Sequence, residues 1–558
     1  MTSAATTEWI ACGGCAQPVY GKRFARTEKV CPLCGWHAPL SAVERITSLF
    51  DEGSARPLPW VETTEDPLGF SDTTPYSARL AKARDATGAR EAILCVRATI
   101  MGHPLIAAVM DFAFLGGSMG TAVGEAIAGA AETALHDRVP LLVVTASGGA
   151  RMQESILSLM QMAVTARAFA DLDAAGILSL GLITDPTYGG VAASFAALPD
   201  VLIAEQGARM GFAGPRVIRQ TIGAELPKGF QTAEFLTDHG FIDMVRPRGA
   251  LRHTLARLLD VWAARTTPPK PVEPVPGAPF TVHKPSDLAD VDPWQVVRDA
   301  RDPRRPTSAD YVTELVRGFE ELRGDRVSGD CSAIIGGFGL LQGMPVLVLG
   351  HQKGHETDEL VQRNFGMASP QGYRKTTRLM RLAAKLKVPV LTFIDTPGAY
   401  PGITAEEDGQ SFAIAENLRV MSSLPVPIVS VITGEGGSGG ALALGVADRV
   451  LALSGSCYSV ISPEGCAAIL WKSPQEAPLA ARALRIRARD LLGSEVVDAV
   501  VPEPPAGAAE DGAAMARALE GAVVEAFLEL IETDPENLTA IRRRRFRKFA
   551  NHIDKGEL

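Results

Sequence analysis

Four cysteines near the start of the chain are spaced as metal ligands usually are. Cys12 and Cys15 form one Cys-x2-Cys pair, and Cys31 and Cys34 form a second pair after fifteen intervening residues. One such pair would equally suit a redox disulfide, but two pairs at this spacing can present four thiolates tetrahedrally to zinc. The pattern therefore predicts a four-cysteine zinc ribbon over residues 8–40, with one zinc ion per chain.

The remaining cysteines and the N-terminus indicate the compartment. Cys95, Cys331, Cys457 and Cys466 are scattered in apolar or Gly-rich surroundings, which is typical of buried small side chains and not of a disulfide framework. Residues 1–10 contain no basic region followed by an apolar one, and no apolar run approaches the ~20 residues that a membrane span needs. These features predict a cytoplasmic protein that does not enter a membrane.

Glycine-rich turns are the second feature that could carry chemistry. The segments are 147–150, 188–190, 396–399 and 434–440, and each follows an apolar, strand-like run. Backbone N–H groups at such a turn, where a helix begins, can bind an anionic oxygen and form an oxyanion hole. Glycines could also serve only to let helix and strand pack closely, but matching turns in two halves of the chain favour a function.

The richest of these turns, 434–440, also fits two catalytic signatures. Its G-x-G-x-x-G pattern would suit a dinucleotide, but the acidic residue expected about twenty positions later is missing. Its G-x-S-x-G pattern would make Ser438 a nucleophile, but the only later histidine is His552, in a charged tail. The oxyanion-hole interpretation survives both comparisons, because an enzyme that stabilises enolates can rely on its substrate for a base.

The glycine turns belong to a repeat that organises the whole chain. Residues 102–107 correspond to 343–348 at an offset of 241, and residues 138–144 correspond to 387–393 at an offset of 249. Short β-branched or Leu-rich runs alternate with Ala-rich stretches in both halves, which predicts duplicated β-α domains. Between the halves, six of the fourteen residues of 266–279 are proline, which predicts an extended linker outside either core.

Composition limits the classes of function. With 558 residues and 46% hydrophobic content the chain can bury large cores, and its formal net charge of −9 argues against a broad nucleic-acid-binding surface. The basic run at residues 542–548 could attract an acidic partner or nucleic acid, although a solvated helix end explains it equally simply.

Longer strings in both halves carry a family resemblance. They are residues 112–120, 146–154, 184–190 and 211–218 in the first half, and residues 350–354, 363–367, 393–402, 434–440 and 458–466 in the second. With these strings the chain resembles the carboxyltransferase of bacterial acetyl-CoA carboxylase, with its β and α subunits fused in that order, over residues 9–260 and 293–505. The resemblance implies an α/β fold with two crotonase-like domains (ClpP/crotonase) in tandem after the zinc ribbon. It places a β-subunit-like domain at 41–265, the Pro-rich linker at 266–291 and an α-subunit-like domain at 292–558.

The resemblance also implies site residues. The N–H groups of Gly189 and Gly190 would hold the thioester oxygen of acetyl-CoA, and those of Gly439 and Gly440 would hold the ureido oxygen of biotin. The CoA side would be lined by Ser147, Gly148, Gly149, Ala150 and Arg151, and the candidate cations for phosphate or carboxylate contacts are Lys353, Arg363, Arg374 and Lys375. For each cation, a solvated side chain or a structural ion pair is the alternative.

The implied activity is that of a biotin-dependent transferase, which moves a carboxyl group from carboxybiotin to acetyl-CoA and gives malonyl-CoA for fatty acid synthesis. Carboxybiotin would arrive on a separate carrier protein, so the expected partners are biotin carboxylase, biotin carboxyl carrier protein and further copies of the same chain. Carboxylation of propionyl-CoA or another short acyl-CoA, acyl-CoA decarboxylation and nucleic-acid binding by the zinc ribbon are the alternatives.

Overall fold

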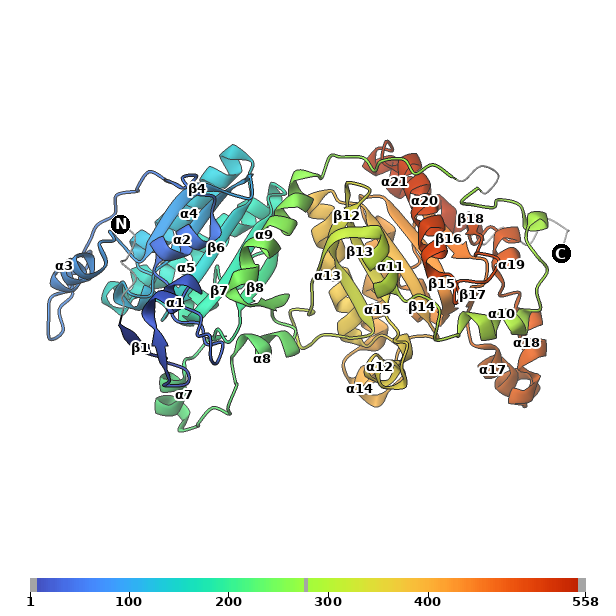
Figure 1. The fold of residues 1–558 in the computed structure, drawn as a ribbon, viewed down its shortest axis with the longest axis horizontal. Coiled ribbons are helices and arrows are strands. Elements are labelled where there is room, and N and C mark those ends of the chain that lie inside the picture. Colours follow the sequence, from blue (N-terminus) through green and yellow to red (C-terminus); the bar gives the residue numbers. More distant parts are fainter. Residues whose placement is uncertain (1–7, 275–278, 550–558) are drawn as a thin grey trace. The chain divides into compact units, whose positions relative to one another are not determined.

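The computed structural model describes residues 8–274 and 279–549. The chain divides into two compact units, residues 1–262 and 263–558, and each unit has its own mixed sheet with helices packed on it (Figure 1). Within the described residues, no helix is long and apolar enough to cross a membrane.

The first unit is centred on an eight-stranded sheet in the order β10-β8-β7-β6-β5-β4-β3, with β9 beside β7. Strands β4 and β5 form an antiparallel hairpin, whereas β5, β6, β7, β8 and β10 run parallel. The strands are β3 (Arg56–Pro57), β4 (Ile93–Ile100), β5 (His103–Met110), β6 (Leu141–Ser147), β7 (Ser179–Tyr188), β8 (Val201–Glu205), β9 (Met210–Gly211) and β10 (Met244–Arg246). Every residue of β6 is buried, which explains why this central strand is a continuous apolar run in the sequence.

Helices of the first unit connect these strands. The helices are α1 (Gly21–Arg26), α2 (Ala42–Leu49), α3 (Tyr76–Thr87), α4 (Thr121–Asp137), α5 (Ser155–Ala174), α6 (Gly189–Ala192), α7 (Pro215–Ile222), α8 (Ala233–Asp238) and α9 (Arg248–Ala263). Helices α4 and α5 pack against each other, and α4 also contacts strands β4 to β6. The short helix α6 starts directly at the end of β7, so the glycine turn at Tyr188–Gly190 is a strand-to-helix junction.

The second unit repeats this arrangement, with the strand order β11-β12-β13-β14-β15-β16-β18 and β17 beside β15. Its strands are β11 (Val316–Glu321), β12 (Ile334–Leu341), β13 (Met344–His351), β14 (Val390–Thr396), β15 (Ile428–Gly437), β16 (Arg449–Leu453), β17 (Cys457–Ser459) and β18 (Ala499–Val501). Its helices are α10 (Pro293–Ala300), α11 (Ser308–Leu315), α12 (Thr357–Gln362), α13 (Pro370–Leu386), α14 (Ile403–Glu407), α15 (Gln410–Ser423), α16 (Ser438–Leu442), α17 (Pro463–Cys466), α18 (Ala477–Leu484), α19 (Ala488–Gly493), α20 (Gly512–Leu530) and α21 (Pro535–Lys548).

Helices cover both faces of the second sheet. Val346 and Val348 of β13 belong to one core cluster with residues of α11 and α20. The alternate side chain, Leu349, faces the other way, because it and Leu379 of α13 both lie within about 3 Å of the position that a Cβ on Gly336 would take. The sheet is therefore the middle layer of three.

The register of the strands confirms the duplication that the sequence predicts. Strand β5 pairs with β6 through Ile106 and Leu141, and β13 pairs with β14 through Leu347 and Val390, at the offsets of 241 and 249 residues. The helices that lead into β6 and β14 also end alike. Their C-caps, Arg138 and Lys387, have φ values of 53° and 58°. After each helix the chain therefore passes through a left-handed residue into a Val-Pro pair and the next strand.

The Pro-rich segment differs from its expectation in one respect. The N–H of Lys270 donates to the carbonyl of Gln342, and Val282 exchanges backbone hydrogen bonds with Val500 of β18. Phe280 packs against the core cluster of the second unit. Proline makes the segment extended, but its N–H groups still donate to the β12–β13 turn and to β18, and Phe280 packs on the core.

Candidate active site and metal cluster

The two glycine turns adopt the same conformation. Gly189 is the first residue of α6 with a φ of 60°, and Ser438 is the first residue of α16 with a φ of 60°. This equivalence aligns Gly190 with Gly439, whereas Gly440 stands one position further into its helix. A serine in a left-handed conformation is strained, a state that clusters at functional sites.

A second loop lies beside each turn and is fastened in the same way. The Ser147 hydroxyl accepts the N–H of Gly149 at 3.0 Å, and the Thr396 hydroxyl accepts the N–H of Gly398 at 3.1 Å. Gly149 and Gly398 both have positive φ values, 120° and 155°. Each loop is thus held by a hydroxyl at the end of β6 or β14, close to the helix that starts at the neighbouring turn.

In the first unit, backbone bonds decide which N–H groups remain free for a ligand. The N–H of Gly189 donates to the carbonyl of Phe212 at 3.0 Å, so this predicted donor is engaged in the structure. Gly190 lies in the first turn of α6, where N–H groups have no intrahelical partner. The bridge to Met119 uses the carbonyl of Gly149 and the N–H of Arg151, which leaves out the N–H of Ala150 between them.

In the second unit, Gly439 and Gly440 have different surroundings. A Cβ on Gly440 would lie 2.4 Å from the backbone nitrogen of Ala399, so only glycine fits beside that loop. A Cβ on Gly439 would meet nothing within 4 Å, because this residue borders a cavity of about 980 Å³. Ala399 thus lies next to the helix that starts at the turn, as Ala150 lies next to Gly190 in the first unit.

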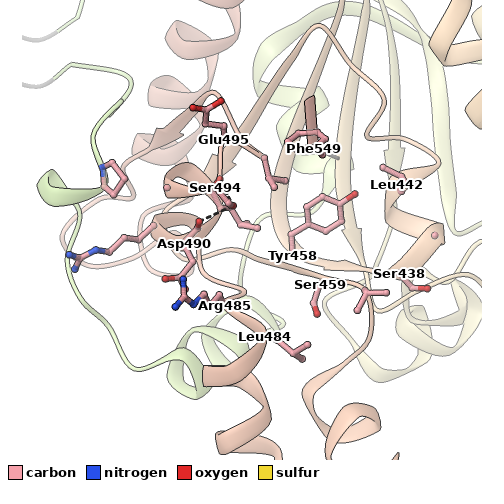
Figure 2. A pocket seen from close by; sticks show the side chains of 17 residues that line it. Ser438, Leu442, Tyr458, Ser459, Leu484, Arg485, Asp490, Ser494, Glu495 and Phe549 are labelled. Carbon is pink, nitrogen blue, oxygen red and sulfur yellow. Dashed lines mark hydrogen bonds between the residues drawn. The ribbon is translucent and has the colours of Figure 1, made fainter. Parts of the chain in front are cut away.

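The cavity beside Gly439 has apolar and polar walls. In Figure 2, Tyr458 stands in the middle of the lining, with Ser438 and Leu442 on one side and Asp490 and Ser494 on the other. Leu442, Val460 and Leu484 contribute apolar surface, and Ser459 contributes a hydroxyl. Arg485, Arg489, Asp490 and Glu495 add charged groups, so the cavity combines an apolar wall with a polar, charged one.

Arg151 is part of a buried network of hydrogen bonds and ion pairs in the first unit. Its side chain is 1% exposed, and its guanidinium donates to the carboxylate of Glu91 at 2.8 Å, to the Tyr76 hydroxyl at 3.0 Å and to the backbone carbonyl of Ser118 at 2.8 Å. Burial lowers the pKa of Arg151, but the Glu91 carboxylate and the Tyr76 hydroxyl outweigh it and hold the pKa above its ordinary value. The place of Arg151 on the CoA side stays a prediction, and in this structure its guanidinium is engaged by these buried partners.

The predicted cations of the second unit are also engaged. Lys375 is fully buried and donates to Asp330 at 2.6 Å and to two backbone carbonyls. Arg374 donates to Asp325 at 2.8 Å, and Arg363 donates to a backbone carbonyl at 3.0 Å. Lys375 is thus a structural cation, while Arg363 and Arg374 keep partly exposed side chains.

Lys353 belongs to an acidic cluster that the sequence did not single out. Its ammonium donates to Asp395 at 2.6 Å, and the same carboxylate accepts the N–H of Glu435 at 3.0 Å. Gly434 is glycine because a Cβ there would lie 2.4 Å from Asp395. Asp395 could have been suspected from its place at the end of a buried strand, in the string 393–402.

His351, also missed by the sequence, lies beneath the Gly440 turn. It is fully buried at the end of β13 and faces the backbone of Phe393 and Gly440. Burial lowers its pKa to about 4, so the imidazole is neutral at pH 7.

We expect Arg151→Met to lower the free energy of unfolding by about 3–5 kcal/mol, because it leaves Glu91 and Glu154 as buried carboxylates without their cation. Urea unfolding followed by circular dichroism measures the change. Arg167→Met is the matched control, since Arg167 is 77% exposed and paired only with Asp171 on the same helix. Unchanged stability together with a raised KM for acyl-CoA would instead support the contact with CoA.

The four predicted metal ligands come together in the structure. The sulfurs of Cys12, Cys15, Cys31 and Cys34 all lie within 4.8 Å of one another, with Cys12 to Cys34 at 3.7 Å and Cys15 to Cys31 at 4.0 Å. Four thiolates about 2.3 Å from a tetrahedral zinc ion would be about 3.8 Å apart. The donor set and its geometry are therefore consistent with zinc.

Local packing shapes the ribbon that carries these cysteines. Strands β1 (Trp9–Ala11) and β2 (Pro18–Tyr20) pair around the first knuckle. Cβ atoms on Gly13 and Gly14 would lie 2.6 Å and 2.7 Å from the Trp36 side chain, so glycine is needed beneath that ring. The first knuckle is thus closed by packing as well as by its ligands.

A buried ion cluster ties the ribbon to the rest of the first unit. Arg248 donates to the carbonyls of Glu28 and Ala38 and, at 2.7 Å, to Glu205. Arg45 also donates to Glu205 at 2.7 Å. Burial raises the pKa of Glu205, but the two guanidiniums outweigh it and lower the pKa to about 2, so the carboxylate is ionised.

The fold has relatives among solved structures. Transcarboxylase 12S, described as a hexamer with methylmalonyl-coenzyme A bound, aligns with a TM-score of 0.67 at 23% identity and covers 88% of this chain and 91% of its own. A single-chain, multi-domain long-chain acyl-CoA carboxylase aligns with a TM-score of 0.65 at 17% identity, over 87% of this chain and 45% of its own. These likenesses confirm the predicted fold class of two crotonase-like α/β domains in tandem.

Sequence relatives narrow the class to a family. A family described as acetyl co-enzyme A carboxylase carboxyltransferase-like matches residues 282–550. The acetyl-coenzyme A carboxylase carboxyl transferase subunits beta/alpha of Parafrankia sp. is 56% identical over 99% of this chain and 92% of its own length, and that of Clostridium tetani is 41% identical over 98% and 94%. The separate alpha subunit of Yersinia pestis is 53% identical over 48% of this chain and 82% of its own. The chain therefore belongs to the family of acetyl-CoA carboxylase carboxyltransferases with beta and alpha subunits in one chain, as the sequence predicts.

Proposed function

We propose that the chain transfers a carboxyl group from carboxybiotin to acetyl-CoA, and that the two equivalent turns stabilise the negative charge that develops on each substrate. One observation carries the proposal. Each unit sets the start of a short helix, α6 or α16, beside a loop fastened by a hydroxyl group, and this arrangement supports the binding of one oxygen by N–H groups of both elements.

The acyl side belongs to the first unit. The N–H of Gly190 and the N–H of Ala150 are the donors proposed for the thioester oxygen, because Gly189 donates to Phe212 in the folded chain. The other residues predicted for the CoA side, Ser147, Gly148 and Gly149, then act by holding the loop. Removing one donor of an oxyanion hole typically costs about 10²–10³ in kcat.

The biotin side belongs to the second unit. Gly439 lines the cavity of about 980 Å³, so its N–H is the donor proposed for the ureido oxygen, and the apolar surface of Leu442 and Tyr458 suits a small uncharged ring. Gly440 supports this site by allowing α16 to approach Ala399 closely. The neutral His351 lies behind the turn, away from any exposed surface.

The remaining proposals concern the metal and the partners. Zinc is the ion proposed for the four cysteines, in a structural role, because four thiolates would fill all four positions of a tetrahedral ion and leave none for a substrate. Biotin carboxylase and biotin carboxyl carrier protein are the proposed partners. Association of the chain with itself is supported by an exposed apolar stripe at the start of α5, which consists of Met152, Ile156, Leu159 and Met160.

The purified chain should convert malonyl-CoA to acetyl-CoA in the presence of biocytin, with carboxylated biocytin as the second product. Spectrophotometric coupling of acetyl-CoA formation measures the reverse rate, and omission of biocytin is the control. Absence of biocytin-dependent turnover would contradict the proposal, and decarboxylation of malonyl-CoA that ignores biocytin would favour the decarboxylase alternative.

Acetyl-, propionyl- and butyryl-CoA should be compared in the forward direction with biotin carboxylase and carrier added. One methylene changes transition-state binding by only about 1–3 kcal/mol, so we expect acetyl-CoA to be preferred by about 10–200-fold in kcat/KM. A preference for propionyl-CoA would reassign the substrate and keep the class of reaction.

A further inference from the structure

The basic run at residues 542–548 divides into anchored and free side chains. Arg542 is 1% exposed, and all five of its N–H donors are used, on Asp448 and on the carbonyls of Met421, Leu424 and Val426. Farther along α21, Arg545 pairs with Asp498, and Lys548 pairs with Glu495. These three cations fix the helix to the second unit (red in Figure 1).

Arg543 and Arg547 are the cations left over. Both are exposed, and within the described residues neither has a hydrogen bond or an ion pair. They stand four residues apart on α21, hence on one face of the helix, where like charges destabilise each other. The nearby carboxylates of Asp448, Asp498 and Glu495 are already paired, so neutralisation of this face requires an external anion.

A cavity of about 520 Å³ opens beside this pair of arginines. Its apolar lining comes from Leu418 of α15, Leu442 of α16, Val446 and Phe546. Its polar lining consists of Ser422, Ser423, Thr539, Arg542, Arg543 and Arg547. The volume falls within the range of about 300–1,000 Å³ that is usual for small-molecule sites.

The combination of lining groups defines a class of ligand. Two unpaired guanidiniums recognise a phosphate or a carboxylate through charge-assisted hydrogen bonds. The apolar walls accept a hydrocarbon chain, whose affinity rises with each methylene removed from water. Neither half of such a ligand would satisfy the cavity alone.

Leu442 connects this cavity with the proposed biotin site. It is the last residue of α16, and it lines both the cavity of about 520 Å³ and the cavity beside Gly439. The end of α21 reaches both as well, because Phe546 lines the first cavity and the C-cap residue Phe549 lines the second. The two cavities therefore share Leu442 as a wall residue, which an occupant of either one would contact.

We infer that this cavity is a regulatory site for a soluble amphipathic anion, a molecule with one phosphate or carboxylate group on a hydrocarbon chain. Binding of the anion can be measured without any enzyme activity. The coupling of this site to the transfer reaction through Leu442 rests on the proposed function.

Titration calorimetry with octyl phosphate, below the concentration at which it aggregates, tests the binding. We expect the full chain to bind octyl phosphate, with affinity rising about 3–4-fold per added methylene from hexyl to decyl phosphate. Inorganic phosphate and octanol, each carrying half of the ligand, should bind at least tenfold more weakly. Equal affinity for inorganic phosphate would overturn the apolar part of the inference.

The double variant Arg543→Gln/Arg547→Gln should weaken octyl phosphate binding at least tenfold while leaving the melting temperature unchanged, since neither side chain has a partner in the fold. Arg544→Gln is the matched control, an exposed arginine of the same helix outside the cavity lining. An equal loss in both variants would mean general charge attraction and would overturn the site. Loss of binding to anionic phosphatidylglycerol vesicles, with no binding of monomeric octyl phosphate, would assign the arginines to a membrane surface instead.

Saturating octyl phosphate should change the KM for biocytin by about fivefold or more in the parent chain and not in the double variant. Binding without this change would overturn the coupling through Leu442. A chain without carboxyl transfer would contradict the proposed function and leave the calorimetric result standing.

Discussion

Gly439→Val is expected to lower carboxyl transfer by about 10²–10³-fold and to leave the chain folded. The residue borders the open cavity, and a Cβ there would meet no atom within 4 Å, so the fold can accept a side chain. The valine methyl groups would instead fill the space in front of the N–H donor, where the substrate oxygen must bind, which is equivalent to losing one oxyanion donor. Steady-state kinetics with malonyl-CoA and biocytin measure the loss, and thermal unfolding verifies the fold.

Two further glycines provide the comparison. Gly493→Val adds the same side chain to the same cavity away from the turn, with Pro285 as its nearest contact at 3.7 Å, and should change kcat/KM by less than about fivefold. Gly440→Ala should lower the melting temperature, because its Cβ would lie 2.4 Å from the Ala399 nitrogen. Full activity of Gly439→Val would remove this N–H from the mechanism, and an equal loss in Gly493→Val would show only that the cavity was filled.

Cys31→Ser should release most of the bound zinc and unfold the ribbon. Structural zinc sites contribute about 10–16 kcal/mol of apparent binding free energy, and a serine hydroxyl is a poor substitute for a thiolate at neutral pH. The loss should spread beyond the ribbon, since Arg248 depends on the carbonyls of Glu28 and Ala38. Metal analysis by mass spectrometry, together with thermal unfolding of the same preparation, measures both effects.

Cys95→Ser is the matched control for the zinc experiment. Cys95 lies on β4, outside the cluster, and burial raises the pKa of its thiol to about 12, as expected for an unreactive side chain. The variant should keep one zinc ion per chain. If Cys31→Ser retained the metal content and melting temperature of the parent chain, the four-cysteine zinc site would be disproved as a structural element.

Much of the fold could be predicted because it is encoded locally and twice. Runs such as Leu141–Ser147 are buried on both faces of a sheet, and their apolar continuity is visible without a structure. The similar offsets between the halves, 241 and 249 residues, reflect one topology used for both sheets. The paired Cys-x2-Cys motifs needed only their spacing to indicate a metal site, because each ligand pair is formed within a single turn.

The sequence alone could not predict contacts between segments that lie far apart in the chain. It grouped Arg151 and Lys375 with the ligand-binding cations, since charge alone does not reveal whether a cation meets solvent or a buried carboxylate. Arg151 is buried because Glu91, 60 residues away, folds against it, and Lys375 is buried because Asp330 does the same. The basic run of α21 divided into anchored and free arginines for the same reason.

The sequence by itself determined the duplicated α/β domains, the four-cysteine cluster and the position of the glycine turns, because periodicity, spacing and glycine are local properties of the chain. The tertiary structure decided which backbone donors those turns can offer. In the folded chain the N–H of Gly189 donates to the carbonyl of Phe212, and Gly440 packs closely against Ala399. Gly190 and Gly439 occupy equivalent positions in the two turns. A hydrogen bond or a steric contact between segments far apart in the sequence exists only once the sheet has brought them together.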